Sequence, residues 1–93
     1  MKPVFVSPRA YADIRYLEAW LAERNTIAAL KVGPLPFEAM MSLREFPERG
    51  RQAVNYRGRE LNVPFGAHAY IIRYRVEPDR VIIATVHHSL ERR

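Results

Sequence analysis

The chain has 93 residues, of which 48% are hydrophobic, and it contains no cysteine. This length predicts one domain, residues 1–93, and the composition excludes a disordered chain, a disulfide framework and a thiolate metal site. The net charge is +5, and because Lys2 and Lys31 are the two lysines, thirteen of the fifteen basic residues are arginines.

The predicted elements begin with a short strand and an amphipathic helix. Residues 4–6 form a short apolar run that ends at Ser7-Pro8. Serine suits the N-cap of a helix and proline suits its first position. We expect this helix to continue to Asn25. Apolar residues at i, i+4, i+7 and i+11 predict its buried face: Ala10, Ile14, Leu17 and Leu21.

The second helical region is predicted to be kinked or broken. Residues 26–32 can form two turns, and residues 37–46 resume a helical pattern. Between them lies Gly33-Pro34-Leu35-Pro36, where each proline removes a backbone donor and crowds the preceding turn. Pro47 is expected to end the second part.

Three antiparallel strands are predicted in the C-terminal half of the chain. They comprise residues 59–63, 70–76 and 81–86, with turns at 64–66 and 77–80 and a polar loop before them at 48–58. Alternation in the second strand places Tyr70, Ile72, Tyr74 and Val76 on one face of the sheet and Ile71, Arg73 and Arg75 on the other.

The elements together predict an α+β fold. A short N-terminal strand precedes a two-helix hairpin and a three-stranded antiparallel meander. The helices must cover one face of the sheet to bury their apolar stripes. The face that bears Arg73 and Arg75 is then left for solvent or for a partner.

The sequence also argues against several kinds of site. No apolar run approaches the roughly 20 residues needed to cross a bilayer, and charge follows the N-terminal residues too closely for a signal peptide. We therefore expect a cytoplasmic protein. His68, His87 and His88 lack zinc-site spacing, so no metal site is expected. No cofactor and no small-molecule substrate are expected either. His68 is expected to be a loop residue with no evident role.

Motifs spread over nearly the whole chain resemble those of the RelE/ParE toxin superfamily, and the ParE branch in particular. The motifs, in order, are Ser7-Pro8-x-Ala10-x-x-Asp13-Ile14, Ala22-Glu23-Arg24-Asn25, Leu43-x-x-Phe46-Pro47-Glu48-x-Gly50-Arg51, Arg59-Glu60-Leu61-x-Val63, Tyr70-Ile71-Ile72-x-Tyr74-Arg75-Val76 and Val81-Ile82-Ile83 followed by Val86-His87-His88. Each motif also has a purely structural interpretation: Gly50, for example, could satisfy a backbone angle that is closed to other residues.

The resemblance implies a toxin of a type II toxin–antitoxin pair, neutralised by a cognate antitoxin whose C-terminal segment wraps around it. Such a segment folds on binding and can cover a large surface. The resemblance also offers two activities. ParE-like members bind DNA gyrase and block it, and are linked to plasmid stabilization, whereas RelE-like members cut mRNA in the ribosome.

One substitution favours gyrase inhibition without catalysis. Aligned on Tyr74-Arg75-Val76, the chain has Ile71 where nuclease members carry an arginine on the middle strand. Isoleucine can neither neutralise a phosphate nor donate a proton. In the alternative nuclease interpretation the catalytic residues would be Glu60, Arg73 and His88, with histidine as a general acid or base. His87 is one position away from the matched histidine.

The residues expected to contact the antitoxin are Arg73 and Arg75 on the open sheet face and Arg15 and Trp20 on the first helix. An arginine-rich surface suits an acidic wrapping segment. A solvated sheet face is the simpler alternative for Arg73 and Arg75. A third hypothesis, a basic nucleic-acid-binding domain, is weaker because the sequence shows neither an arginine-rich recognition helix nor an aromatic platform.

Overall fold

A computed structural model of the chain describes residues 1–24, 27, 35–65 and 68–89. The elements, in chain order, are β1 (Val4–Val6), α1 (Pro8–Arg24), α3 (Leu35–Ser42), β2 (Arg51–Gln52), β3 (Arg59–Phe65), β4 (His68–Val76) and β5 (Val81–His88). Two helices and a five-stranded sheet therefore account for the described elements, and the α+β class is confirmed.

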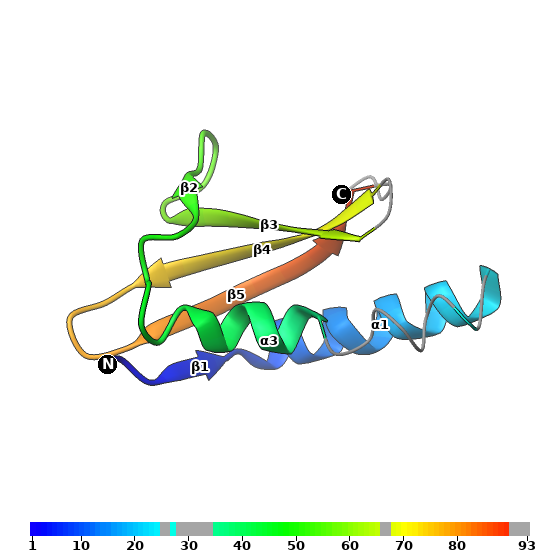
Figure 1. Ribbon diagram of the computed structural model, residues 1–93, viewed down its shortest axis with the longest axis horizontal. Coiled ribbons are helices and arrows are strands. Elements are labelled where there is room, and N and C mark those ends of the chain that lie inside the picture. Colours follow the sequence, from blue (N-terminus) through cyan, green and yellow to red (C-terminus); the bar gives the residue numbers. More distant parts are fainter. Residues whose placement is uncertain (25–26, 28–34, 66–67, 90–93) are drawn as a thin grey trace.

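The sheet is mixed and has the strand order β1-β5-β4-β3-β2 (Figure 1). β1 lies parallel to β5, with Val4 opposite Val81 and Val6 opposite Ile83. The other neighbours are antiparallel, so the predicted meander is present as β3, β4 and β5. The prediction of a plain loop at residues 48–58 was wrong, because β2 adds a fifth strand there. A pair of exposed polar residues has no apolar alternation that could have marked it.

The first helix agrees with its prediction. Ser7 Oγ accepts the backbone N–H of Ala10, so serine is the N-cap, and Pro8 is the first helical residue. The buried positions include the whole predicted stripe, together with Asp13. The helix is described to Arg24, and Asn25 lies outside the described residues.

The second helix begins earlier and ends earlier than expected. Leu35 and Pro36 are its first two residues, where the missing N–H of a proline costs no helical hydrogen bond. Pro36 therefore lies inside the helix instead of interrupting it. The helix ends at Ser42, where Leu43 and Arg44 donate to the carbonyls of Met40 and Met41 in tighter turns. Residues 28–34, which include the rest of the predicted break, lie outside the described part.

Two strands of the meander extend beyond their predicted ends. β3 continues through Pro64, which was assigned to a turn. Among the described residues, β2 pairs with Arg59 and Glu60 and does not reach Pro64, and a proline is tolerated at such an edge position of a sheet. β4 begins at His68, so this histidine is a strand residue and not a loop residue.

One hydrophobic core joins both helices to one face of the sheet. Its buried residues come from α1, the α3 region and strands β3 to β5: Ala10, Ile14, Leu17, Leu21, Ala39, Met40, Leu43, Leu61, Val63, Tyr70, Ile72, Tyr74, Val81, Ile83 and Val86. Ile71, Arg73 and Arg75 are absent from this core, so the two described helices, α1 and α3, pack on the opposite face of the sheet. None of the described helices is long and apolar enough to cross a membrane.

Candidate functional site

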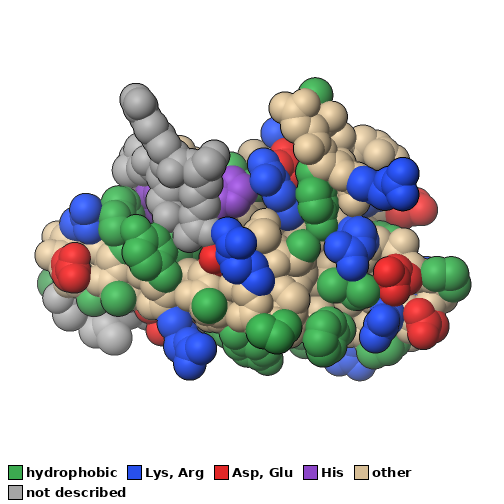
Figure 2. Space-filling view, turned by 180° about the vertical axis from the view of Figure 1, so that it is seen from behind, with side chains coloured by type: hydrophobic (Ala, Val, Ile, Leu, Met, Phe, Trp, Pro, Cys, Tyr) green, Lys and Arg blue, Asp and Glu red, His purple; other side chains and the backbone are tan. Residues whose placement is uncertain are grey.

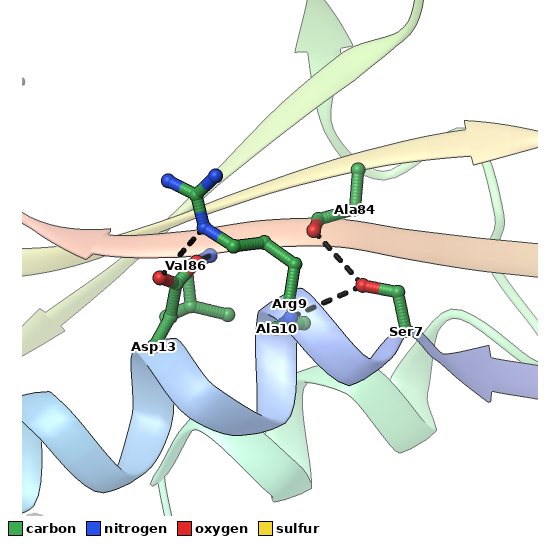
Figure 3. A network of polar contacts seen from close by, with 6 residues as sticks. All are labelled: Ser7, Arg9, Ala10, Asp13, Ala84 and Val86. Atoms are coloured by element: carbon green, nitrogen blue, oxygen red, sulfur yellow. Dashed lines mark hydrogen bonds and ion pairs between the residues drawn. The ribbon is translucent and has the colours of Figure 1, made fainter.

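The start of α1 covers the edge of β5 beyond the point where β1 ends (Figure 3). β1 pairs with β5 only as far as Ile83, and Ser7 then donates its backbone N–H to the Ile83 carbonyl. The Ser7 hydroxyl donates to the carbonyl of Ala84 at 2.9 Å. One serine thus caps the helix and satisfies a strand carbonyl that β1 does not reach.

Asp13 continues this edge. Its Oδ2 accepts the Val86 N–H at 3.0 Å and its Oδ1 accepts from Arg9 Nε at 3.1 Å. The carboxylate is buried, whereas the Arg9 side chain is largely exposed. The motif Ser7-Pro8-x-Ala10-x-x-Asp13 therefore joins α1 to β5, and its chemistry is structural.

A β-bulge in β5 decides which way the two C-terminal histidines point. Thr85 lies opposite Arg73 but Ile83 lies opposite Tyr74, so Ala84 is an extra residue without a partner on β4. The extra residue reverses the alternation between Ile83 and Val86. Strict alternation would place His88 on one face with Ile82, Ala84 and Val86, whereas the bulge leaves it on the face of Val86 and Ile83 and away from Ile82.

His88 lies on the covered side of the sheet and is 1% exposed. Its ring packs on Trp20 of α1 with the centroids 4.8 Å apart, and it meets the Tyr70 ring edge-on at 6.3 Å. The guanidinium of Arg24 lies over the Trp20 ring, with its central carbon 4.0 Å from the ring centroid. His88 and Trp20 thus anchor the C-terminal half of α1 to the end of β5.

The open face of the sheet carries an ion-paired cluster. Glu60 Oε2 accepts from Arg73 Nε at 2.8 Å, and Glu60 Oε1 lies 3.4 Å from Arg51 Nη2. The Arg73 guanidinium also lies 5.8 Å from the centroid of the Tyr56 ring. The hydrogen bond from Arg73, with the nearby charges of both arginines, lowers the pKa of Glu60 against the opposing effect of burial. This carboxylate is therefore held in its charged form.

His87, and not His88, shares the open face with Glu60 and Arg73. Its Cα partner on β4 is Ile71, which in turn lies opposite Asn62 of β3. The candidate nuclease set is thus divided: the structure brings Glu60 and Arg73 together and places His88 on the other side of the sheet. The bulge has no sequence signal that we can identify, so strict alternation could not have selected His87.

The loop before β2 is organised around the hydroxyl of Tyr74. This hydroxyl accepts the Gly50 N–H at 2.7 Å and donates to the Pro47 carbonyl at 2.8 Å. A Cβ on Gly50 would lie 2.6 Å from the same hydroxyl oxygen and 2.7 Å from the Glu60 carbonyl. Close approach, and not an unusual backbone angle, therefore requires glycine here, since Gly58 is the described glycine with a positive φ.

The comparison with known proteins agrees with these motifs. Residues 4–93 match the family described as "ParE toxin of type II toxin-antitoxin system, parDE". The chain belongs to this ParE toxin family. It is also similar to two proteins of Caulobacter vibrioides, named "Toxin RelE1" and "Toxin RelE3". The identity is 46% over 97% of this chain and 96% of the first relative, and 43% over the full length of both chains for the second.

The resemblance to a ParE-like toxin is thereby confirmed, and the chain is the toxin of a type II toxin–antitoxin system, which pairs with a cognate antitoxin. The structure places the four residues expected to contact the antitoxin on two faces. Arg73 and Arg75 lie on the open sheet face of this toxin, whereas Arg15 and Trp20 lie on α1. Arg15 is exposed and helps to line a hollow of about 450 Å³ together with Phe5, Val6, Pro8 and Tyr11.

Trp20 is less accessible than its position beside the helix stripe suggested. It is half-buried, packs against the core, and contacts His88 and Arg24. A partner at this position would therefore meet the Arg24 guanidinium as well as the indole. Arg24 belongs to one of the quoted motifs, but its contact with Trp20 was not predicted, because a pairing four residues apart is ordinary on one helix face.

Proposed function

We propose that this toxin inhibits DNA gyrase by binding it and that its antitoxin neutralises it by covering the binding surface. The observation that carries the proposal is the separation of His88 from the Glu60–Arg73 pair. His88 is buried against Trp20 on the covered side of the sheet, and the ion pair lies on the other side. These three groups cannot converge on one phosphate.

The chemistry of the open face supports the same proposal. Cleavage of RNA at a 2′-hydroxyl needs a base near the nucleophile and a cation or donor for the developing charge. The lowered pKa of Glu60, which the hydrogen bond from Arg73 chiefly causes, makes this carboxylate a weaker base near neutral pH. Ile71 adds an apolar side chain between Asn62 and His87.

The second candidate is a ribosome-dependent mRNA endonuclease. Two observations favour it: both similar proteins bear the name RelE, and His87 shares the open face with Glu60 and Arg73. In this candidate His87 would replace His88 as the general acid or base. The structure therefore changes which histidine the experiment must test.

A paired assay separates the two candidates. Purified toxin is added to a gyrase supercoiling reaction and to a translation reaction in which message cleavage is read by primer extension. We expect loss of supercoiling and an intact message, and we expect His87→Ala to keep the inhibition. Message cleavage that is lost with His87→Ala but kept with Glu45→Ala would instead establish the nuclease.

For the antitoxin we propose a wrapping segment that contacts Arg15 and Trp20 on α1 and Arg73 and Arg75 on the open sheet face. Because these residues lie on two faces of the toxin, they favour a segment that passes around it over a partner that binds at a single compact epitope. The excess of arginine supports an acidic segment.

A further inference from the structure

The hairpin formed by β2 and the start of β3 projects from the end of the sheet (Figure 1). It concentrates positive charge. Residues 48–60, with the adjacent Arg73 and Arg75 of β4, contain six arginines and two glutamates, a formal charge of +4 out of the +5 of the whole chain. Basic side chains lie on both sides of the projecting hairpin in the view from behind (Figure 2).

We define the hairpin patch as six residues of this region: Arg51, Tyr56, Arg57, Glu60, Arg73 and Arg75. Glu60 binds both Arg51 and Arg73, and Arg73 lies over the Tyr56 ring. The Cγ of Arg75 lies 3.3 Å from the position that a Cβ would take on Gly58, so its stem crosses the base of the same hairpin. Arg57 lies in the exposed loop between the strands.

One carboxylate orders two arginines of the hairpin patch without neutralising the patch. The Arg51 side chain is 72% exposed and the Arg73 side chain is 39% exposed. Arg73 donates to Glu60 through Nε, and this hydrogen bond fixes the orientation of its guanidinium. A guanidinium in a fixed orientation loses less entropy when it binds an anion bidentately, which is a geometry that phosphate accepts well.

The composition of the hairpin patch favours a polyanion over a protein. A protein segment that folds on binding needs apolar contacts in addition to charge. Most of the large exposed hydrophobic side chains lie elsewhere, in the N-terminal half of the chain: Met1, Phe5, Tyr11, Tyr16, Ile27, Met41 and Phe46. Within residues 51–59, all of which are described, Val54 is the one large hydrophobic side chain that is mostly exposed.

We propose that the hairpin patch binds the phosphate backbone of duplex DNA. The inference rests on the proposed function for the choice of DNA among polyanions, because gyrase acts on a DNA duplex. The patch would hold the toxin on the duplex that gyrase has bound. An antitoxin that reaches Arg73 and Arg75 would then compete with DNA for the same guanidinium groups.

Binding to a fluorescein-labelled 20-base-pair duplex, measured by anisotropy over a series of salt concentrations, tests the proposal. The double variant Arg51→Gln, Arg73→Gln removes two phosphate contacts. It should bind more weakly, and its slope of log affinity against log salt should fall by about 1.8, since each contact contributes about 0.9. The control Arg44→Gln, Arg80→Gln makes the same charge change outside the patch and should bind like the wild type. A thermal melt shows whether each variant folds. If the Arg51→Gln, Arg73→Gln variant is unfolded, the double variant Arg57→Gln, Arg75→Gln takes its place.

Three outcomes would overturn the proposal. The wild type could fail to bind the duplex at low salt, or the control could lose as much affinity as the patch variant. Alternatively, a polyglutamate peptide could bind through the patch while the duplex does not, which would identify a surface for an acidic protein. Gyrase supercoiling is assayed in parallel. If the toxin inhibits gyrase but does not bind the duplex, only the proposal that the hairpin patch binds DNA is refuted. If it binds the duplex but does not inhibit gyrase, the proposal that gyrase is its target is refuted.

Discussion

At the scale of single residues, Asp13 is the clearest example of a side chain that supplies a hydrogen-bond partner for a strand's backbone. It accepts the Val86 N–H beyond the end of β1, where a strand would otherwise be needed. An unpaired N–H at a buried position costs free energy comparable to a lost hydrogen bond. Arg9, by contrast, pairs with Asp13 from an exposed position.

This difference gives the first prediction. Asp13→Ala should lower the free energy of unfolding by about 1–3 kcal/mol, because the Val86 N–H is left without its acceptor. Arg9→Ala should cost less than about 1 kcal/mol, since an exposed ion pair contributes little. Urea unfolding of both variants makes the comparison. Equal losses would show that the ion pair, and not the backbone hydrogen bond, holds the carboxylate in place.

Glu60 gives a prediction about pH. Its pKa is lowered in the folded toxin, chiefly by the hydrogen bond from Arg73, so the unfolded chain takes up a proton at a higher pH than the folded one. The stabilisation is therefore present above the unfolded pKa and is lost as the pH falls through the folded pKa. Urea unfolding from neutral pH into the acid range should show Glu60→Gln less stable than wild type at neutral pH and the difference shrinking towards acid. A difference that does not change with pH would contradict the assignment.

At the scale of elements, α1 and the edge of β5 depend on one hydroxyl. Ser7 Oγ accepts from Ala10 N at the helix start and donates to the Ala84 carbonyl at the bulge. The N-terminal turn of the helix and the irregular part of the strand should therefore lose stability together.

Exchange of Ser7 tests this coupling. Ser7→Ala should cost about 1–2 kcal/mol, the range found for the loss of an N-cap, because both hydrogen bonds disappear. Ser7→Thr keeps the hydroxyl and should cost much less. Hydrogen exchange read by NMR should show faster exchange at Ala10 in the alanine variant only. If both variants unfold at the same urea concentration, the hydroxyl does not hold the two elements together.

Part of this architecture could be predicted from sequence. The spacing of Ala10, Ile14, Leu17 and Leu21 determined the buried face of α1, and alternation around Tyr74 determined the faces of β4. Both patterns arise from side chains that repeat with the period of their element. Such patterns predict which side chains are buried as long as the helix or strand is regular.

The features that were not predicted are irregularities of the strands and contacts between residues far apart in the sequence. The extra residue Ala84 turns His88 towards Trp20 and leaves His87 on the open face, so the three candidate nuclease residues do not lie on one face of the sheet. β2 is held by backbone pairing at exposed positions, and Gly50 is required by a tyrosine that lies 24 residues further along the chain. None of these is a local property of the sequence.

At the scale of the whole molecule, the toxin presents two different surfaces. The helical side and β1 carry most of the exposed hydrophobic side chains, and the open sheet face carries Arg73 and Arg75 beside the hairpin. A short chain buries a modest fraction of its surface, so a partner that covers both sides should add much to its stability.

The antitoxin should therefore raise both the melting temperature and the free energy of unfolding of the toxin. At a free concentration 100-fold above the dissociation constant the gain is about 2.7 kcal/mol. Arg73→Glu with Arg75→Glu should weaken antitoxin binding, measured by titration calorimetry. Arg44→Glu with Arg80→Glu makes the same change of charge away from the proposed surface and should not. Similar weakening by both pairs would indicate a general effect of net charge.

The parallel pairing of β1 with β5 has a consequence for the folding of this toxin during its synthesis. Val4 cannot pair with Val81 until the chain has been synthesised through β5, so β1 has no partner strand before that point. Contacts this distant in sequence form slowly. A nascent chain that has not been synthesised through β5 therefore cannot complete the sheet or the core that α1 forms with it.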